Sequence, residues 1–199
     1  FKPVLSFPVA SVCFLACLIG WPTSGNATVA EQLTVEELRS QSTFVVRARV
    51  VDRYVVPIRG PKGEIYTQIE LRATDYVHGD GPRTLVVQQL GGHLDGLTMH
   101  LEGNAQFEVG DDVIAFLDHD PLTGLSYVVG LAQGLFIIKQ AAGSQWVSRN
   151  LDGIAFYGVG APPYAAVHTI TSLDDLMDRL RWREPDVMMS PNLNGEVSQ

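Results

Sequence analysis

Cysteine is scarce in this chain: Cys13 and Cys17 are its only two among 199 residues, and both lie near the start. Residues 31–199 therefore contain no thiol nucleophile, no redox pair and no cysteine ligand for zinc. Because no disulfide can stabilise this part, burial of apolar surface must do so. Roughly 170 residues suffice for that, since a chain of this size buries about 70% of the surface exposed on unfolding.

Basic residues are also few, with 14 Lys and Arg against 22 Asp and Glu, which gives a formal net charge of −8. Nucleic acids and anionic membrane surfaces are bound through basic patches. The charge balance therefore argues against nucleic acid as a partner.

The longest apolar run, from Val9 to Trp21, has about 13 residues, whereas a membrane-spanning helix needs roughly 20. Signal-peptide cores span about 7 to 15 residues, and this one follows Lys2 and precedes Pro22 and several small residues. Residues 1–30 are therefore predicted to be a cleaved secretory signal peptide, leaving no transmembrane segment. Lipidation of Cys17 stays an alternative, although the residues before it fit a lipobox poorly.

Two positions satisfy the preference for small residues at −3 and −1 of a signal-peptide cut. Gly25 with Ala27 would place the mature start at residue 28, and Thr28 with Ala30 would place it at residue 31. Either cut predicts an exported protein, periplasmic or extracellular, whose mature part lacks cysteine.

A short helix is expected after the leader, from Thr34 to Gln41. Thr34 and Glu37 have the spacing of a capping box, in which each side chain bonds the backbone of the other residue. Leu33 and Leu38 have the spacing of a hydrophobic staple across the same turn.

Alternating apolar and polar residues then predict β-strands. Residues 43–54 and 65–74 are expected to form a long antiparallel pair, and a turn at 78–82 leads to a third strand at 84–89. Strands of ten or more residues exceed the usual five or six and suit a coiled barrel.

The rest of the chain continues this pattern. A continuous apolar strand at 113–117 is expected to be buried on both faces. The other expected elements are a short strand at 97–101, strands at 126–129, 135–138 and 145–147, a kink or bulge at 130–134, an irregular connection at 150–168, an amphipathic helix with Ser172 as its N-cap, and a disordered tail at 184–199. Residues 31–183 are predicted to be a single, mainly β domain.

Three segments resemble known proteins. They are 42–50, Tyr76 to Gly79, and 107–116, the last with the sequence Phe-Glu-Val-Gly-Asp-Asp-Val-Ile-Ala-Phe. In this order they resemble a family of uncharacterised exported bacterial proteins and, more distantly, the OB-type barrels of netrin-like and tissue-inhibitor-of-metalloproteinase domains. The resemblance implies an antiparallel OB-like β-barrel with a short N-terminal helix and a C-terminal amphipathic helix. Metalloproteinase inhibitors of that class act through an amino-terminal cysteine, which residues 31–199 lack.

Sequence signatures of catalysis are missing: the chain has no G-x-S-x-G, no H-E-x-x-H and no G-x-x-x-x-G-K-[ST]. Two clusters of possible metal ligands remain. One is Asp118, His119 and Asp120 in a single turn, and the other surrounds the Gly91-Gly92 break. The second cluster consists of His93, Asp95 and His100.

Aromatic residues near the irregular connection form a further candidate binding surface, comprising Trp146, Tyr157 and Tyr164. The sequence as a whole favours an exported, non-catalytic module that binds a protein, peptide or envelope component through barrel loops, without a cofactor. The alternative is a small metal-dependent hydrolase using Asp118, His119 and Asp120, or His93 and His100.

Overall fold

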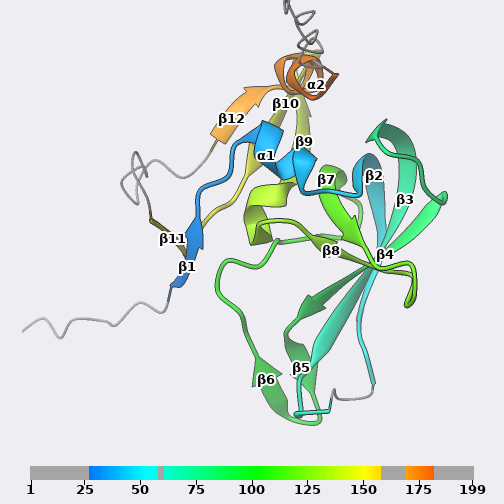
Figure 1. Ribbon diagram of the computed structural model, residues 1–199, viewed down its shortest axis with the longest axis vertical. Coiled ribbons are helices and arrows are strands. Elements are labelled where there is room, and N and C mark those ends of the chain that lie inside the picture. Colours follow the sequence, from blue (N-terminus) through cyan, green and yellow to red (C-terminus); the bar gives the residue numbers. More distant parts are fainter. Residues whose placement is uncertain (1–26, 58–60, 158–168, 182–199) are drawn as a thin grey trace, which may run out of the picture.

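A computed structural model describes residues 27–57, 61–157 and 169–181 (Figure 1). The described part is mainly β, with two α-helices. Among these residues no helix is long and apolar enough to cross a bilayer. The elements are β1 (Thr28–Glu31), α1 (Val35–Ser40), β2 (Phe44–Val55), β3 (Tyr66–His78), β4 (Thr84–Leu90), β5 (Gly92–Leu94), β6 (Leu97–Met99), β7 (Asp112–His119), β8 (Leu125–Val128), the 3₁₀ helix η1 (Leu131–Gly134), β9 (Leu135–Ala141), β10 (Ser144–Arg149), β11 (Ile154–Tyr157), β12 (Thr169–Ser172) and α2 (Leu173–Arg181).

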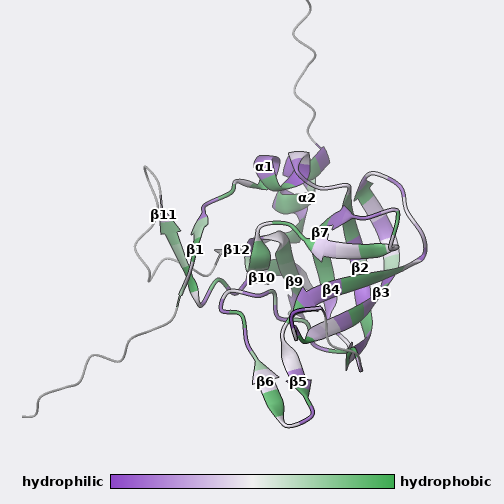
Figure 2. Ribbon diagram, turned by 60° about the horizontal axis from the view of Figure 1, so that its bottom comes forward, coloured by the Kyte–Doolittle hydropathy of each residue, from purple (hydrophilic) through white to green (hydrophobic). Residues whose placement is uncertain are grey.

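Five strands close into a ring in the order β7-β2-β3-β4-β8. The short strand β8 closes it, because it pairs in parallel with β4 and antiparallel with β7. Strands β9, β10 and β12 continue the sheet outward from β7. In both ribbon views the β5–β6 hairpin projects from one end of the ring (Figures 1 and 2).

The expected alternation along the first long strand is confirmed by burial. Phe44, Val46, Ala48 and Val50 all belong to the core cluster that fills the ring. The partner strand β3 contributes Ile69 and Leu71 to the same cluster, and the third strand contributes Leu85 and Val87. The interior of the ring is therefore a packed apolar core.

Strand β7 is buried on both faces, as its continuous apolar sequence predicts. Val113, Ala115 and Leu117 face the ring core, while Ile114 and Phe116 face a second cluster. Apolar side chains of both helices complete this second cluster, namely Val35, Leu38, Leu173, Leu176, Met177 and Leu180.

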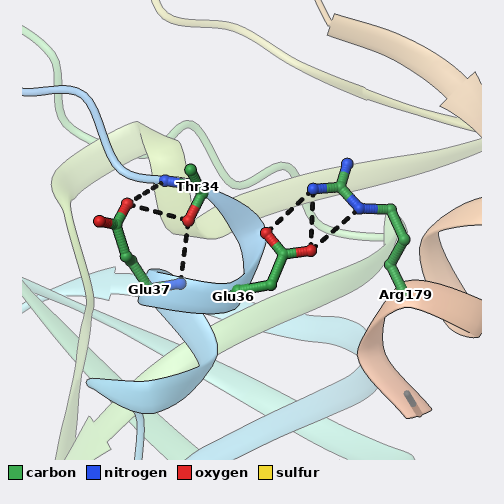
Figure 3. A network of polar contacts seen from close by, with 4 residues as sticks. All are labelled: Thr34, Glu36, Glu37 and Arg179. Atoms are coloured by element: carbon green, nitrogen blue, oxygen red, sulfur yellow. Dashed lines mark hydrogen bonds and ion pairs between the residues drawn. The ribbon is translucent and has the colours of Figure 1, made fainter. Parts of the chain in front are cut away.

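Helix α1 has the capping box that its sequence predicts (Figure 3). The Thr34 hydroxyl accepts from the Glu37 amide at 3.1 Å, and the Thr34 amide donates to the Glu37 carboxylate at 2.7 Å. In the same first turn Glu36 accepts three hydrogen bonds of 3.0–3.1 Å from the Arg179 guanidinium of α2. The first turn of α1 therefore carries one carboxylate that caps the helix, Glu37, and another that links it to α2, Glu36.

The capping box predicts a pH dependence of stability. The hydrogen bond from the Thr34 amide, and then that from its hydroxyl, lower the pKa of the Glu37 carboxyl below its usual value. A lowered folded-state pKa gives stability that is present above the unfolded value and lost as pH falls through the folded value. We expect the melting temperature of Glu37→Ala to lie below that of the parent at about pH 7, and the gap to narrow below about pH 4. A difference in melting temperature that stays unchanged down to about pH 3 would contradict a stabilising role of the ionised Glu37 carboxylate.

The connection expected at 150–168 is not irregular throughout. Strand β11 lies within it and pairs in parallel with β1, from Thr28 opposite Ile154 to Glu31 opposite Tyr157. This pairing joins segments far apart in sequence, which local periodicity cannot reveal. Strand β1 also begins before residue 31, the expected start of the domain. Residues 1–26 of the expected leader at 1–30, and the whole expected tail at 184–199, lie outside the described residues.

Candidate functional site: a polar cleft at one end of the strand ring

A β-bulge in β2 redirects the side chains at the end of this strand. Val50 lies opposite Leu71 on β3, but Asp52 lies opposite Glu70, so Val51 is an extra residue. Directly opposed residues share a face of the sheet. Past the bulge Arg53 opposes Ile69, whose side chain faces the ring core. The bulge therefore turns Arg53 to the inner face, a common role of bulges at barrel rims.

Arg53 lines a cleft of about 80 Å³ at the end of the ring where the β5–β6 hairpin begins. Its polar lining comes from Arg53, Thr67, Gln89, His100, Asn104 and Gln106, and Phe107 belongs to its apolar part. No acidic side chain is among the lining residues of the described chain.

Two glycines shape the cleft wall. Gly91 and Gly92 have φ of +117° and +141°, values that favour glycine. The Gly91 amide donates to the Ile65 carbonyl at 2.7 Å, and the Thr67 hydroxyl donates to the Gly91 carbonyl at 2.8 Å. A Cβ on Gly92 would come within 2.9 Å of the Thr67 hydroxyl oxygen. The chain therefore passes the end of β3 at a distance that only glycine permits.

The opposite wall is also fixed by hydrogen bonds. The Asn104 amide group donates to the Leu90 carbonyl at 2.7 Å, and the Gln106 amide group donates to the Asn104 carbonyl at 3.2 Å. Because the backbone on both sides is held in this way, the cleft is preformed. Preformed concave sites of this kind are common ligand sites.

The cleft carries positive charge on an acidic protein. Arg53 has no ion pair within the described residues. His100 lies 3.4 Å from the Glu102 carboxylate, and both side chains are exposed. The guanidinium therefore supplies the uncompensated charge, and a ligand group that matches it is an anion.

Only one of the three residues predicted around the glycine break lies at the cleft. His100 lines it, whereas His93 is an exposed residue of β5 whose Nδ1 lies 2.9 Å from the Thr98 hydroxyl. Asp95 forms the turn of the hairpin with φ of +52°.

The side chains of the first two residues of the other predicted cluster have different hydrogen-bond partners. The Asp118 carboxylate accepts from the Thr43 hydroxyl at 3.0 Å. His119 Nδ1 lies 3.0 Å from the Ser126 hydroxyl, and the ring packs on Phe44 with centroids 5.3 Å apart.

Asp120 closes the β7–β8 turn. Its carboxylate accepts from the Leu122 amide at 2.9 Å and from the Thr123 hydroxyl at 2.8 Å. These bonds, the Leu122 amide first, lower the pKa of the Asp120 carboxyl below its usual value. Within the described residues no group of three or more His, Cys, Asp or Glu side chains could hold a metal ion.

The predicted aromatic surface is only partly described. Trp146 is half-buried in β10 of the large sheet, and Tyr157 is exposed at the end of β11 in the two-stranded sheet. Tyr164 lies outside the described residues. Neither Trp146 nor Tyr157 lines the cleft.

Of the polar lining residues, sequence reasoning found His100 and missed Arg53, Thr67, Gln89, Asn104 and Gln106. The Gly91-Gly92 pair was the available signal, because it marks a sharp change of direction beside the Gln88-Gln89 pair. The position of Arg53 depends on the bulge, which strict alternation does not contain.

Comparison with known proteins gives no relative. No known family, no curated protein and no solved structure matches this chain. The likeness to exported bacterial proteins and to netrin-like barrels stays a prediction.

Proposed function

We propose that this protein is an exported, non-catalytic binding module that holds a carboxylate of a protein, peptide or envelope component in the cleft at the end of its strand ring. The observation that carries this proposal is the bulge that directs Arg53 into a preformed cleft, whose described lining residues include no acidic side chain. A guanidinium offers two parallel N–H donors, which match the two oxygens of a carboxylate.

The remaining lining residues fit recognition. Amide side chains from Gln89 and Gln106 can donate to a bound oxygen. The Thr67 hydroxyl already donates to the Gly91 carbonyl, so it is engaged in holding the wall. The cleft accommodates one head group of a ligand, whose remaining part would lie outside it.

The fold supports the same reading. A closed ring of five strands, together with the expected resemblance, favours an OB-type barrel, in which loops at the ring end surround the ligand site. In this protein the corresponding segments at the cleft are the start of the β5–β6 hairpin and residues 100–107.

The test compares two probes that differ only at the carboxylate. An N-acetylated tripeptide with a free carboxyl terminus is titrated into the ¹⁵N-labelled chain that begins at Thr28, and the same peptide with a C-terminal amide is titrated in parallel. We expect the acid to move the amide resonances of Gly91 and Gly92 saturably and the amide peptide to leave them in place. Arg53→Gln is expected to weaken binding at least about tenfold, since loss of a charged hydrogen-bond partner costs about 1.5–3 kcal/mol.

Arg49→Gln is the matched control. Arg49 lies on the same strand, but before the bulge, and its exposed guanidinium pairs with Asp112 at 3.0 Å. Its substitution removes one positive charge from β2 and is expected to leave binding unchanged. Equal binding of the acid and amide peptides, no saturable shift with the acid, or equal effects of the two arginine substitutions would each contradict the proposal.

A further inference from the structure

We propose that the leader is removed between Ala27 and Thr28, and that the ammonium group created on Thr28 becomes a structural part of the mature protein, bound by the Gly153 carbonyl beside the Glu102 carboxylate. This assigns one of the two cuts that the sequence leaves open. It rests on the exported character of the proposed function.

Among the described residues, the hydrogen bonds of this end of the chain begin at Thr28. Its backbone nitrogen donates to the Gly153 carbonyl at 2.9 Å, and its hydroxyl donates to the Glu102 carbonyl at 2.6 Å. Ala27, the residue before it, is exposed and outside any strand. The peptide bond between them therefore directly precedes β1, and its cleavage leaves all four residues of this strand in place.

The second candidate bond, between Ala30 and Glu31, lies inside β1. Cleavage there would remove three of the four residues that pair with β11. It would also remove the Ala30 side chain, which packs against the buried cluster formed by Ala132, Leu151 and Ile154. The product would leave these apolar side chains less covered.

The chain stays attached beyond β1 as well. The carboxamide of the buried Gln133 donates to the Glu31 carbonyl at 3.0 Å and accepts from the Leu33 amide at 2.8 Å. From Thr28 to Leu33 the segment is thus hydrogen-bonded to η1 and to the loop before β11. A mature chain that begins at Thr28 keeps all these bonds.

Glu102 gives the new terminus an opposite charge. A Cβ on Gly153 would come within 2.8 Å of a Glu102 carboxylate oxygen, so the carboxylate lies against the residue whose carbonyl accepts from Thr28. An amide N–H in the precursor becomes a charged donor after cleavage. Hydrogen bonds that involve a charge are about twice as strong as neutral ones.

The first experiment identifies the terminus directly. The full chain, with an initiator methionine before Phe1, is expressed in a Gram-negative host, and the exported fraction is analysed by intact mass and N-terminal sequencing. We expect a single species that begins at Thr28. A species that begins at Glu31, or at any other residue, overturns the inference while leaving export intact. Retention of residues 1–27 on all of the protein overturns both the inference and the proposed export.

A second experiment tests the role of the ammonium group and needs no export. Chains that begin at Thr28 and at Glu31 are purified, each with and without Glu102→Gln. We expect the Glu31 chain to melt at least about 4 °C lower, which corresponds to about 1–2 kcal/mol for a protein of this size. Glu102→Gln should lower the melting temperature of the Thr28 chain more than that of the Glu31 chain.

The effect of Glu102→Gln on melting temperature is compared between the two chains. This comparison distinguishes the interaction of Glu102 with the Thr28 terminus from its contact with His100. His100 lies 3.4 Å from the Glu102 carboxylate, and both chains contain this residue, so loss of this contact is expected to contribute equally to both differences. If Glu102→Gln lowers the melting temperature of both chains equally, the carboxylate does not interact with the terminus. If the two parent chains have equal melting temperatures, residues 28–30 of β1 contribute nothing to stability. Either result overturns the corresponding part of the inference.

Discussion

Phe116→Ala is expected to lower the free energy of unfolding by about 3–5 kcal/mol in chemical denaturation, because a large buried ring is lost and a cavity remains. Phe116 has no exposed surface, and its ring centroid lies 5.9 Å from that of Phe136. It belongs to the cluster that includes Leu38 of α1 and Leu176 of α2. The substitution therefore weakens the packing of both helices on the sheet.

Leu122→Ala is the control for this loss. Leu122 sits in the β7–β8 turn and is 95% exposed, so its truncation is expected to change stability by less than about 0.5 kcal/mol. A loss of less than about 1 kcal/mol for Phe116→Ala would contradict the packing described for β7.

Local patterns in the sequence predict the elements well. The capping box at Thr34 and the alternation along residues 43–54 depend on neighbours a few positions apart, and both appear as expected. The apolar run at 113–117 predicts a strand buried on two sides, which the two clusters confirm. Such features follow from local geometry alone.

Long-range pairings are the part that periodicity does not contain. Pairing of β1 with β11, and closure of the ring by β8, each join segments distant in sequence through backbone groups that every residue has. The segment at 130–134, expected to be a kink, forms η1, whose Gln133 binds the backbone at Glu31 and Leu33. Gln133 is a single buried polar side chain that bonds a distant backbone segment, so the alternation of apolar and polar residues does not indicate its role.

The candidate site was predictable only in part, because it too depends on how distant strands pair. His100 and the Gly91-Gly92 break were recognised, and both lie at the cleft. Arg53 was not, because one extra residue at Val51 exchanges the two faces of the strand. Whether a strand contains a bulge depends on its partner, so its own sequence does not show which face a later residue takes.

Gly134→Ala is expected to cost more than about 3 kcal/mol, since it places an atom where the fold has no space. Gly134 is buried at the end of η1, directly before β9. A Cβ there would run into the Val129 carbonyl oxygen, and it would lie 3.3 Å from the Phe116 Cβ. The blocking atom belongs to the backbone, so a rotamer change cannot relieve the contact. Denaturation at equilibrium measures the loss, and near-UV circular dichroism shows whether the native packing survives.

Gly143→Ala distinguishes this clash from the general cost of replacing a glycine. Gly143 lies in the β9–β10 hairpin with φ of +81°, and beyond its two chain neighbours no atom of the described residues lies within 4 Å of the position its Cβ would take. The added methyl group there meets only the backbone preference against positive φ, about 1–2 kcal/mol. If Gly134→Ala cost no more than Gly143→Ala, the chain at η1 would have room to move, and the close approach of Gly134 to Val129 would not be required for the fold.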